Sequence, residues 1–214
     1  MKSISNFFAN LRRKKQQKQY AEAHRDTIRS TYLLDKTTPF AVREARNLKA
    51  SISIAIPKEG ISLLCTSTFP EEGKTTVTVN LALMFAMSKV KVVLLDADIR
   101  KGRVSKYFGA PHKPGLSDYL SGQAKFEDIL HQSKEHENLY IIYQGTASPR
   151  PYELLESEAM REFSEKLKKE FDYIIYDTPP IQLVSDALLI PLRTAFGDRH
   201  MKTYGNDIKA SLIH

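Results

Sequence analysis

The sequence predicts an α/β domain in which a doubly wound, mostly parallel sheet is flanked by helices. Apolar runs alternate with helix-patterned segments, and the runs are unbroken, as expected for strands that are covered on both faces. Aspartates close two of these runs, and a Gly-Lys-Thr loop follows a third. Because ligands bind beyond the carboxyl ends of strands in such sheets, these polar groups are expected to share one edge.

Hydrophobic spacing assigns each element in turn. Val77, Leu81 and Met84 recur at helical intervals, and Phe163 and Leu167 do so later in the chain. The predicted strands are 61–66, 91–96, 139–143 and 173–177, and the predicted helices are 39–54, 75–88, 116–120, 126–131, 152–155 and 160–171. Strands that alternate with helices imply parallel pairing with right-handed crossovers.

The 214 residues are interpreted as a basic tail and linker (1–38) followed by one phosphate-loop domain (39–214). The net charge is +7, of which residues 1–30 carry +6 and the remaining chain +1. A nearly neutral body argues against a broad nucleic-acid-binding face. The single Cys65 excludes an intramolecular disulfide framework and favours a reducing compartment.

The first 18 residues leave two interpretations open. One helical face carries Ile4, Phe7, Phe8 and Leu11 and precedes the basic run 12–15, which is typical of contact with an anionic membrane surface. The same residues also suit a solvated tail. No apolar run approaches the 18 residues of a membrane span.

The loop after the first strand has the chemistry of a phosphate site. A strand, a Gly-Lys-Thr loop and a helix follow one another, so backbone N–H groups at the helix start would face an anion. Lys74 would reach the terminal phosphates, and the hydroxyl of Thr75 would bind Mg²⁺. The first glycine of the usual pattern is replaced by Thr68. The predicted nucleotide-binding residues are Glu72, Gly73, Lys74, Thr75 and Thr76.

Three aspartates at strand ends would complete this site. Asp177 closes an apolar strand, where phosphate-loop proteins keep a magnesium carboxylate (the Walker B position). Asp96 and Asp98 alternate along another strand end, so we expect their side chains to lean to the same side. The hypothesis requires Asp177 within about a dozen ångströms of Lys74, close enough to share one cation.

These motifs resemble those of the bacterial tyrosine kinases of capsular and exopolysaccharide synthesis. The phosphate loop 66–76, the Asp-x-Asp-x-Arg sequence at 96–100 and the strand 171–180 match three family elements in order. Further likeness runs through 115–120, 151–155 and 185–187. The resemblance covers 39–190.

The resemblance implies an autophosphorylating, ATP-dependent protein-tyrosine kinase that regulates polysaccharide export. Lys74 would bind phosphate, and Thr75, Asp98 and Asp177 would hold Mg²⁺. Asp96 would act as the base toward a tyrosine hydroxyl, and Asp96 and Asp98 could exchange roles. The implied partners are a membrane-anchored activator, protein tyrosine substrates and further copies of the chain, in the cytoplasm at the inner face of the plasma membrane.

The chain departs from the family pattern in four places. Glu71 stands where the family commonly has glycine, and a carboxylate there is unfavourable near phosphates unless it points outward. Arg43, Arg46 and Lys49 stand where the family's oligomer-forming helix reads Glu-x-x-Arg-x-x-Arg. After Ile190 the apolar strand of the family does not follow, so the C-terminal strands are expected to be missing. The terminal tyrosine cluster, which such kinases phosphorylate on each other, is also lacking.

Two other functions stay open. A partitioning or septum-positioning ATPase would share the loop, although such proteins carry a second lysine where this chain has Phe69. A nucleotide-binding regulator with weak or no catalysis would also fit the altered C-terminal third.

Overall fold

The structure is a computed structural model and describes part of the chain. The described residues are 46–53, 60–134, 136–180, 202–204 and 208–213. The predictions for the tail 1–38, for the helix start at 39–45 and for the segment 181–201 lie outside these residues.

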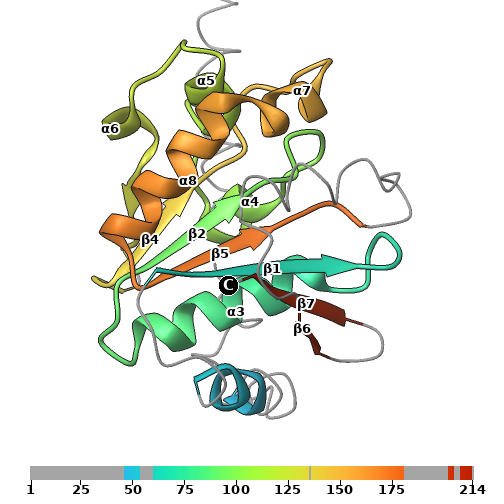
Figure 1. Cartoon of the computed structure of the whole chain (residues 1–214), viewed down its shortest axis with the longest axis vertical. Coiled ribbons are helices and arrows are strands. Elements are labelled where there is room, and N and C mark those ends of the chain that lie inside the picture. The colour runs from blue at the N-terminus through green and yellow to red at the C-terminus, as the bar shows by residue number, and fades with distance from the viewer. Residues whose placement is uncertain (1–45, 54–59, 135, 181–201, 205–207, 214) are drawn as a thin grey trace, which may run out of the picture.

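Within the described part, seven strands form one sheet in the order β3-β4-β2-β5-β1-β7-β6 (Figure 1). The bounds are β1 Ile61–Ser67, β2 Val92–Asp96, β3 His131–Gln132, β4 Leu139–Ile142, β5 Tyr173–Asp177, β6 Lys202–Tyr204 and β7 Ile208–Ile213. The four strands β4, β2, β5 and β1 pair in parallel, whereas the outer strands pair antiparallel. The predicted doubly wound α/β fold is confirmed, with antiparallel edges that make the sheet mixed.

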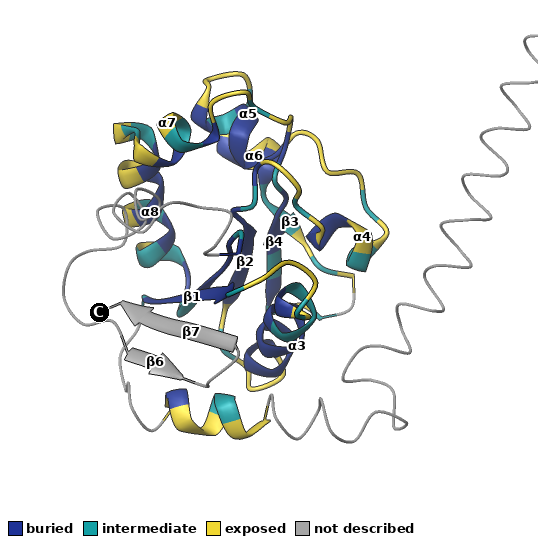
Figure 2. Cartoon of the chain, turned by 90° about the vertical axis from the view of Figure 1, so that its right-hand side faces the viewer, coloured by how far each residue is buried: buried dark blue, intermediate teal, exposed yellow. Residues whose placement is uncertain are grey.

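Helices cover both faces of the parallel strands (Figures 1 and 2). Their bounds are α3 Lys74–Ala86, α4 Val104–Phe108, α5 Leu116–Leu120, α6 Phe126–Ile129, α7 Pro151–Glu156 and α8 Glu158–Glu170. Side chains of α3, α4 and the helical residues 46–53 join one buried cluster, and those of α5 to α8 join the other. None of the described helices is both long and apolar enough to cross a bilayer.

The two buried clusters arise from the alternation of side chains along the strands. In β2, Val92 and Leu94 face the α3 side, whereas Val93 and Leu95 face the α8 side. All five residues of this strand are buried. Continuous apolar sequence is therefore required in the central strands, because neither face meets solvent.

Helix α3 is buried around most of its circumference. Ten of its thirteen residues are buried, so it lacks a polar face. It begins at Lys74 and ends at Ala86, slightly earlier than the predicted 75–88. Such burial fixes the start of the helix relative to the sheet, and this start is also the end of the phosphate loop.

Two features of the sheet differ from the sequence-based expectations. The expected absence of C-terminal strands is wrong, because β7 pairs antiparallel with β1 from Ser62 to Ser67 and β6 pairs with β7. This pairing covers an edge of β1 that would otherwise expose unpaired backbone groups. Residue 131, predicted to be helical, belongs to the short strand β3, and α4 was not predicted.

Phe163 of α8 is the centre of an aromatic cluster and tests the packing on that face. It is fully buried, with ring centroids 4.9 Å from Tyr119 and 6.0 Å from Phe126. We expect Phe163→Ala to lower the free energy of unfolding by about 3–5 kcal/mol, because it leaves a cavity. Urea unfolding measures this, with Met87→Ala as the control because Met87 is 56% exposed. Equal losses in both variants would contradict the packing described.

Candidate active site

The phosphate loop joins β1 to α3 and is held by its own side chains. Gly73 precedes the helix with a φ of 78°, a left-handed conformation that favours glycine. The Glu72 carboxylate accepts hydrogen bonds of 3.0 Å from the backbone N–H groups of both Thr68 and Phe69. Ser67 Oγ donates to the carbonyl of Phe69 at 2.9 Å. The loop is therefore shaped before any ligand binds, although it lacks the first glycine.

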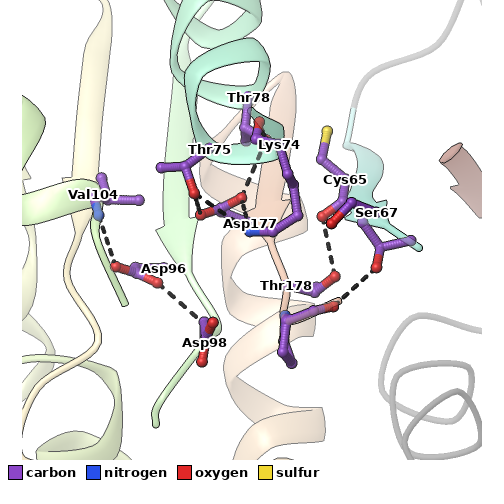
Figure 3. Close-up of polar contacts among 12 residues, drawn as sticks. Cys65, Ser67, Lys74, Thr75, Thr78, Asp96, Asp98, Val104, Asp177 and Thr178 are labelled. Atoms are coloured by element: carbon purple, nitrogen blue, oxygen red, sulfur yellow. Dashed lines mark hydrogen bonds and ion pairs between the residues drawn. The ribbon is translucent and has the colours of Figure 1, made fainter. Parts of the chain in front are cut away.

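Lys74 and Asp177 form a buried ion pair at the centre of the site (Figure 3). The ammonium Nζ lies 2.5 Å from Asp177 Oδ1, and the side chains are 8% and 1% exposed. The hydroxyl of Thr75 donates to Asp177 Oδ2 at 2.8 Å, and that of Thr78 lies 3.3 Å from Oδ1. The expected proximity of Lys74 and Asp177 is confirmed.

The strand ends that carry this pair are tied together. β1 and β5 are parallel neighbours, and Cys65 is level with Asp177. Thr178 donates to the carbonyl of Cys65 through its backbone N–H at 3.1 Å and its hydroxyl at 3.0 Å (Figure 3). Thr66 Oγ1 donates to the carbonyl of Pro179 at 2.9 Å. These bonds hold the loop lysine and the strand-end carboxylate in a fixed relation.

Asp96 and Asp98 occupy different environments. Asp96 is fully buried and accepts hydrogen bonds from the backbone N–H groups of Val104 at 3.0 Å and Asp98 at 3.3 Å. Asp98 is only half-buried, accepts a bond from the N–H of Lys101 at 3.0 Å and lines the cavity beside the phosphate loop. Asp96 therefore supports the turn, and Asp98 faces the open space.

Burial dominates the titration of the buried carboxyls. Desolvation raises the pKa of Asp96 well above its ordinary value, and the nearby charge of Asp177 adds to the rise. Desolvation also raises the pKa of Asp177, while the Lys74 ammonium and the hydroxyls of Thr75 and Thr78 oppose that rise. The Lys74 contact favours the ionised form of Asp177, and at Asp96 the hydrogen bond from the Val104 N–H opposes the rise in pKa that burial causes.

A cavity of about 390 Å³ opens over these groups. Gly73, Lys74, Thr75 and Thr76 line it on the loop side, and Asp98 and Asp177 line it on the strand side. Its volume falls within the range of small-ligand sites, roughly 300–1,000 Å³. A substrate that enters this cavity meets the helix start, the lysine and two carboxylates together.

Glu71 and Glu72 have distinct orientations in the loop. The Glu71 side chain is 78% exposed and lies 3.7 Å from the Arg103 guanidinium, so it points outward, away from the phosphate site. The Glu72 carboxylate is turned back into the loop, and Glu72 is not among the residues that line the cavity. Its side chain therefore shapes the loop, and a role of Glu72 in binding nucleotide stays a prediction for its backbone.

Sequence reasoning missed several residues at the site, of which three make or adjoin its polar contacts. Thr78 lies one helical turn after Lys74, a spacing that could have revealed its contact with Asp177. Arg103 and Tyr107 also line the cavity, and the Tyr107 hydroxyl lies 2.6 Å from Thr76 Oγ1. Both follow the Asp-x-Asp-x-Arg sequence: Arg103 directly precedes the short helix α4 and Tyr107 lies on it, and the sequence pattern did not predict this helix.

The donor set suits Mg²⁺ shared with a phosphate ligand. Among the described residues, no group of three or more His, Cys, Asp or Glu side chains could hold a metal ion by itself. Thr75 and Asp177 instead offer a hydroxyl and a carboxylate oxygen 2.8 Å apart. Mg²⁺ commonly takes one or two protein carboxylates and completes its shell with phosphate oxygens and water. The residues present therefore fit this ion.

Comparisons with known proteins agree with this geometry. A family model described as AAA domain matches residues 72–197, more than half of the chain. Tyrosine-protein kinase ptk of Acinetobacter johnsonii is 32% identical over 176 residues, which cover 80% of this chain and 24% of ptk. Tyrosine-protein kinase CpsD of Streptococcus pneumoniae is 44% identical over 126 residues, which cover 58% of this chain and 55% of CpsD. The solved BceF tyrosine kinase domain matches with 30% identity and a TM-score of 0.68, covering 85% of this chain and 74% of that one.

The fold and the site define a nucleotide-binding domain of the phosphate-loop class. Within that class, the chain belongs to the AAA domain family and to its bacterial tyrosine-protein kinases. It spans less than two thirds of the length of ptk and of CpsD.

The buried ion pair predicts a characteristic pattern of stabilities. We expect Asp177→Asn to lower the free energy of unfolding by about 3–5 kcal/mol, because it leaves the Lys74 ammonium buried without a counter-charge. The double variant Lys74→Met/Asp177→Asn should recover most of this loss, since neither charge is then buried. Urea unfolding of the three proteins measures both effects.

The control for this experiment is Glu153→Gln, which removes one partner of the exposed Arg150–Glu153 pair. An exposed pair contributes about 0–1 kcal/mol, so this change should be small. A double variant as unstable as Asp177→Asn would contradict the ion-pair interpretation.

Proposed function

We propose that this chain is an ATP-dependent protein-tyrosine kinase that phosphorylates itself and other proteins in capsular or exopolysaccharide biosynthesis and export. The observation that carries the proposal is the convergence of Lys74, Thr75 and Asp177 in one cavity with Asp98 on its wall. Phosphoryl transfer requires mainly positioning and neutralisation of charge, and these groups can provide both. The family membership supports the same reaction.

The loop and the start of α3 would bind the phosphates of ATP. The backbone N–H groups that follow Gly73 belong to the first turn of a 13-residue helix, whose dipole favours an anion. The Lys74 ammonium lies at this helix start and can place its charge on the terminal phosphates. Thr76 lines the same cavity and continues the binding surface.

Thr75 and Asp177 would hold Mg²⁺, which when bound neutralises charge on the phosphate oxygens. Asp98 as a further metal partner stays a prediction. In the proposed reaction, the tyrosine oxygen forms a bond to the γ-phosphorus, the bond between that phosphorus and the β,γ-bridging oxygen breaks, and ADP leaves. The phenolic proton passes to a carboxylate.

We assign this proton to Asp98 rather than to Asp96, the residue first expected to act as the base. Asp98 lines the cavity and is half-exposed, so an incoming hydroxyl can approach it. Asp96 is fully buried, and both of its carboxylate oxygens accept backbone hydrogen bonds. We propose that Asp96 positions the turn that presents Asp98.

The proposed partners follow from the family. A membrane-anchored activator would stimulate the kinase, protein tyrosines would accept phosphate, and copies of the chain would phosphorylate one another. The reaction would take place in the cytoplasm, where ATP is available, beside the inner face of the plasma membrane. Residues 1–18 would add contact with anionic lipid.

Two alternatives give different products. A septum-positioning ATPase would release free phosphate, yet the position of its second lysine is occupied by Phe69, which is 50% exposed. A regulator without catalysis would bind nucleotide and release neither product. The same assay separates all three.

The decisive assay incubates the chain with labelled ATP, Mg²⁺ and a cytoplasmic activator peptide. We expect phosphotyrosine to form, and to be lost in Lys74→Met because the phosphates lose their cation. Chelation of Mg²⁺ with EDTA should abolish the same product. Thin-layer chromatography of free phosphate and immunodetection of phosphotyrosine provide the two readouts.

Lys169→Met is the matched control, because Lys169 is exposed on α8 and remote in sequence from the loop. It should retain full activity. Free phosphate without phosphotyrosine would favour the ATPase, and nucleotide binding without either product would favour the regulator.

The assignment of Asp98 predicts different consequences for two isosteric variants. We expect Asp98→Asn to lower kcat by about 10²–10⁴-fold with little change in the Kd for ATP, because the proton acceptor is lost. Asp96→Asn should chiefly lower stability, because an amide group then faces a backbone N–H donor. Steady-state kinetics and urea unfolding distinguish the effects. A larger loss of kcat in a stably folded Asp96→Asn would reverse the assignment.

A further inference from the structure

A second cavity, of about 380 Å³, lies beside the cavity over Gly73, Lys74 and Asp177, which we call the nucleotide cavity. We call it the basic cavity, because its lining includes the charged side chains of Arg100, Lys101, Arg103 and Lys106 together with His112. All five are exposed, and no Asp or Glu is among its lining residues. The basic cavity therefore concentrates positive charge next to the proposed reacting centre.

The two cavities share one wall. Lys101 and Arg103 line both of them. Two hydrogen bonds hold the backbone of this shared wall, residues 101–103, in place. Asp98 accepts a bond from the N–H of Lys101 at 3.0 Å, and the side chain of Gln144 donates to the carbonyl of Gly102 at 3.3 Å. The position of the basic cavity is thus set relative to Asp98.

The wall is also anchored to the buried core of the site. The Val104 N–H, directly after the wall, donates to the fully buried Asp96 at 3.0 Å (Figure 3). Gly102 leaves no space for a side chain on this turn, because a Cβ at Gly102 would lie within 2.7 Å of the Asp96 Cγ. The turn therefore cannot move away from Asp96 without losing these contacts.

The charge of Arg103 is only weakly compensated by its ion-pair partner. Arg103 lies 3.7 Å from Glu71, but both side chains are more than half exposed. Such pairs contribute about 0–1 kcal/mol and are readily exchanged for another partner. An incoming carboxylate can therefore compete for Arg103.

We propose that the basic cavity binds acidic side chains next to the acceptor tyrosine, so that the substrates are tyrosines in acidic peptide segments. This inference rests on the proposed kinase function. A tyrosine whose hydroxyl reaches Asp98 would place its neighbouring residues along the wall of Lys101 and Arg103. Acidic neighbours meet complementary charge there, and basic neighbours are repelled.

A peptide fits these observations better than a nucleic acid. Sequence-independent binding of nucleic acid uses a basic surface that follows the phosphate backbone. This chain has a net charge of only +1 outside residues 1–30, and the basic cavity is a local feature. Its continuity with the wall of Asp98 matches a substrate that must also deliver a hydroxyl.

The test compares Arg100→Glu/Lys106→Glu with wild type on two peptides that differ only in Glu or Gln around one tyrosine. For wild type, we expect the KM of the Glu peptide to be about tenfold below that of the Gln peptide, as two or three exposed ion pairs would give. The double variant should abolish this preference, and salt should weaken it in wild type. The matched control is Lys125→Glu/Lys134→Glu, which makes the same change in net charge at exposed residues outside the basic cavity.

A binding measurement separates this inference from the proposed function. Fluorescence anisotropy of the labelled Glu peptide on the full chain requires no turnover. Tight binding that is lost in the double variant supports the role of the basic cavity in peptide binding, even if no phosphotyrosine forms. In that case only the kinase proposal fails. Turnover of both peptides with equal KM in wild type and variant overturns the inference and leaves the kinase standing.

Two further measurements cover a destabilised variant and a nucleic-acid ligand. Arg100→Ala/Lys106→Ala should give a smaller loss in the same direction and replaces the Glu variant if urea unfolding shows that the latter is destabilised. A single-stranded oligonucleotide of equal charge should compete poorly with the Glu peptide. Tighter binding of the oligonucleotide, lost in the same variant, would overturn the assignment to a peptide.

Discussion

The buried ion pair between Lys74 and Asp177 is the interaction on which the site depends. Removing two such charges from water costs several kcal/mol for each ion, so the pair is favourable only with good geometry and additional hydrogen bonds. Thr75 and Thr78 supply hydroxyl donors to the same carboxylate. The pair also requires β1 and β5 to be parallel neighbours, because only then do the loop after β1 and the end of β5 meet. The order of the strands thereby determines the chemistry.

The same parallel alignment creates an electrostatic conflict that the fold resolves. Asp96 at the end of β2 is level with Asp177 at the end of β5, and like charges at neighbouring strand ends repel. Lys74 pairs with Asp177, while Asp96 is held by backbone N–H groups and its pKa is raised. Asp96 then serves as an anchor for the turn that carries Asp98 and separates the two cavities. Asp96 lines neither cavity, yet its hydrogen bond to Val104 holds the turn that lies between them.

Local sequence was sufficient to predict the central strands, α3, α8 and the phosphate loop, because continuous apolar runs and helical spacing are local signals. It failed for β6 and β7, whose pairing with β1 depends on contacts distant in sequence. Local sequence also could not predict the different environments of Asp96 and Asp98. Alternation predicts that both lean to one side, but β2 ends at Asp96, so the strand rule does not extend to Asp98. The sequence also did not predict that the Glu72 carboxylate bonds to the backbone of its own loop.

The charges that line the two cavities assign them different tasks. In the nucleotide cavity, basic and acidic side chains are equal in number: Lys74, Lys101 and Arg103 against Glu71, Asp98 and Asp177. A triphosphate therefore brings negative charge into a nearly balanced site, so its affinity depends on helix N–H groups and an accompanying cation. The basic cavity has no such balance and retains its positive potential beside Asp98. Most of the basic side chains that would attract an acidic acceptor peptide are therefore not those that would neutralise the phosphates. Only Lys101 and Arg103, which line both cavities, would contribute to both.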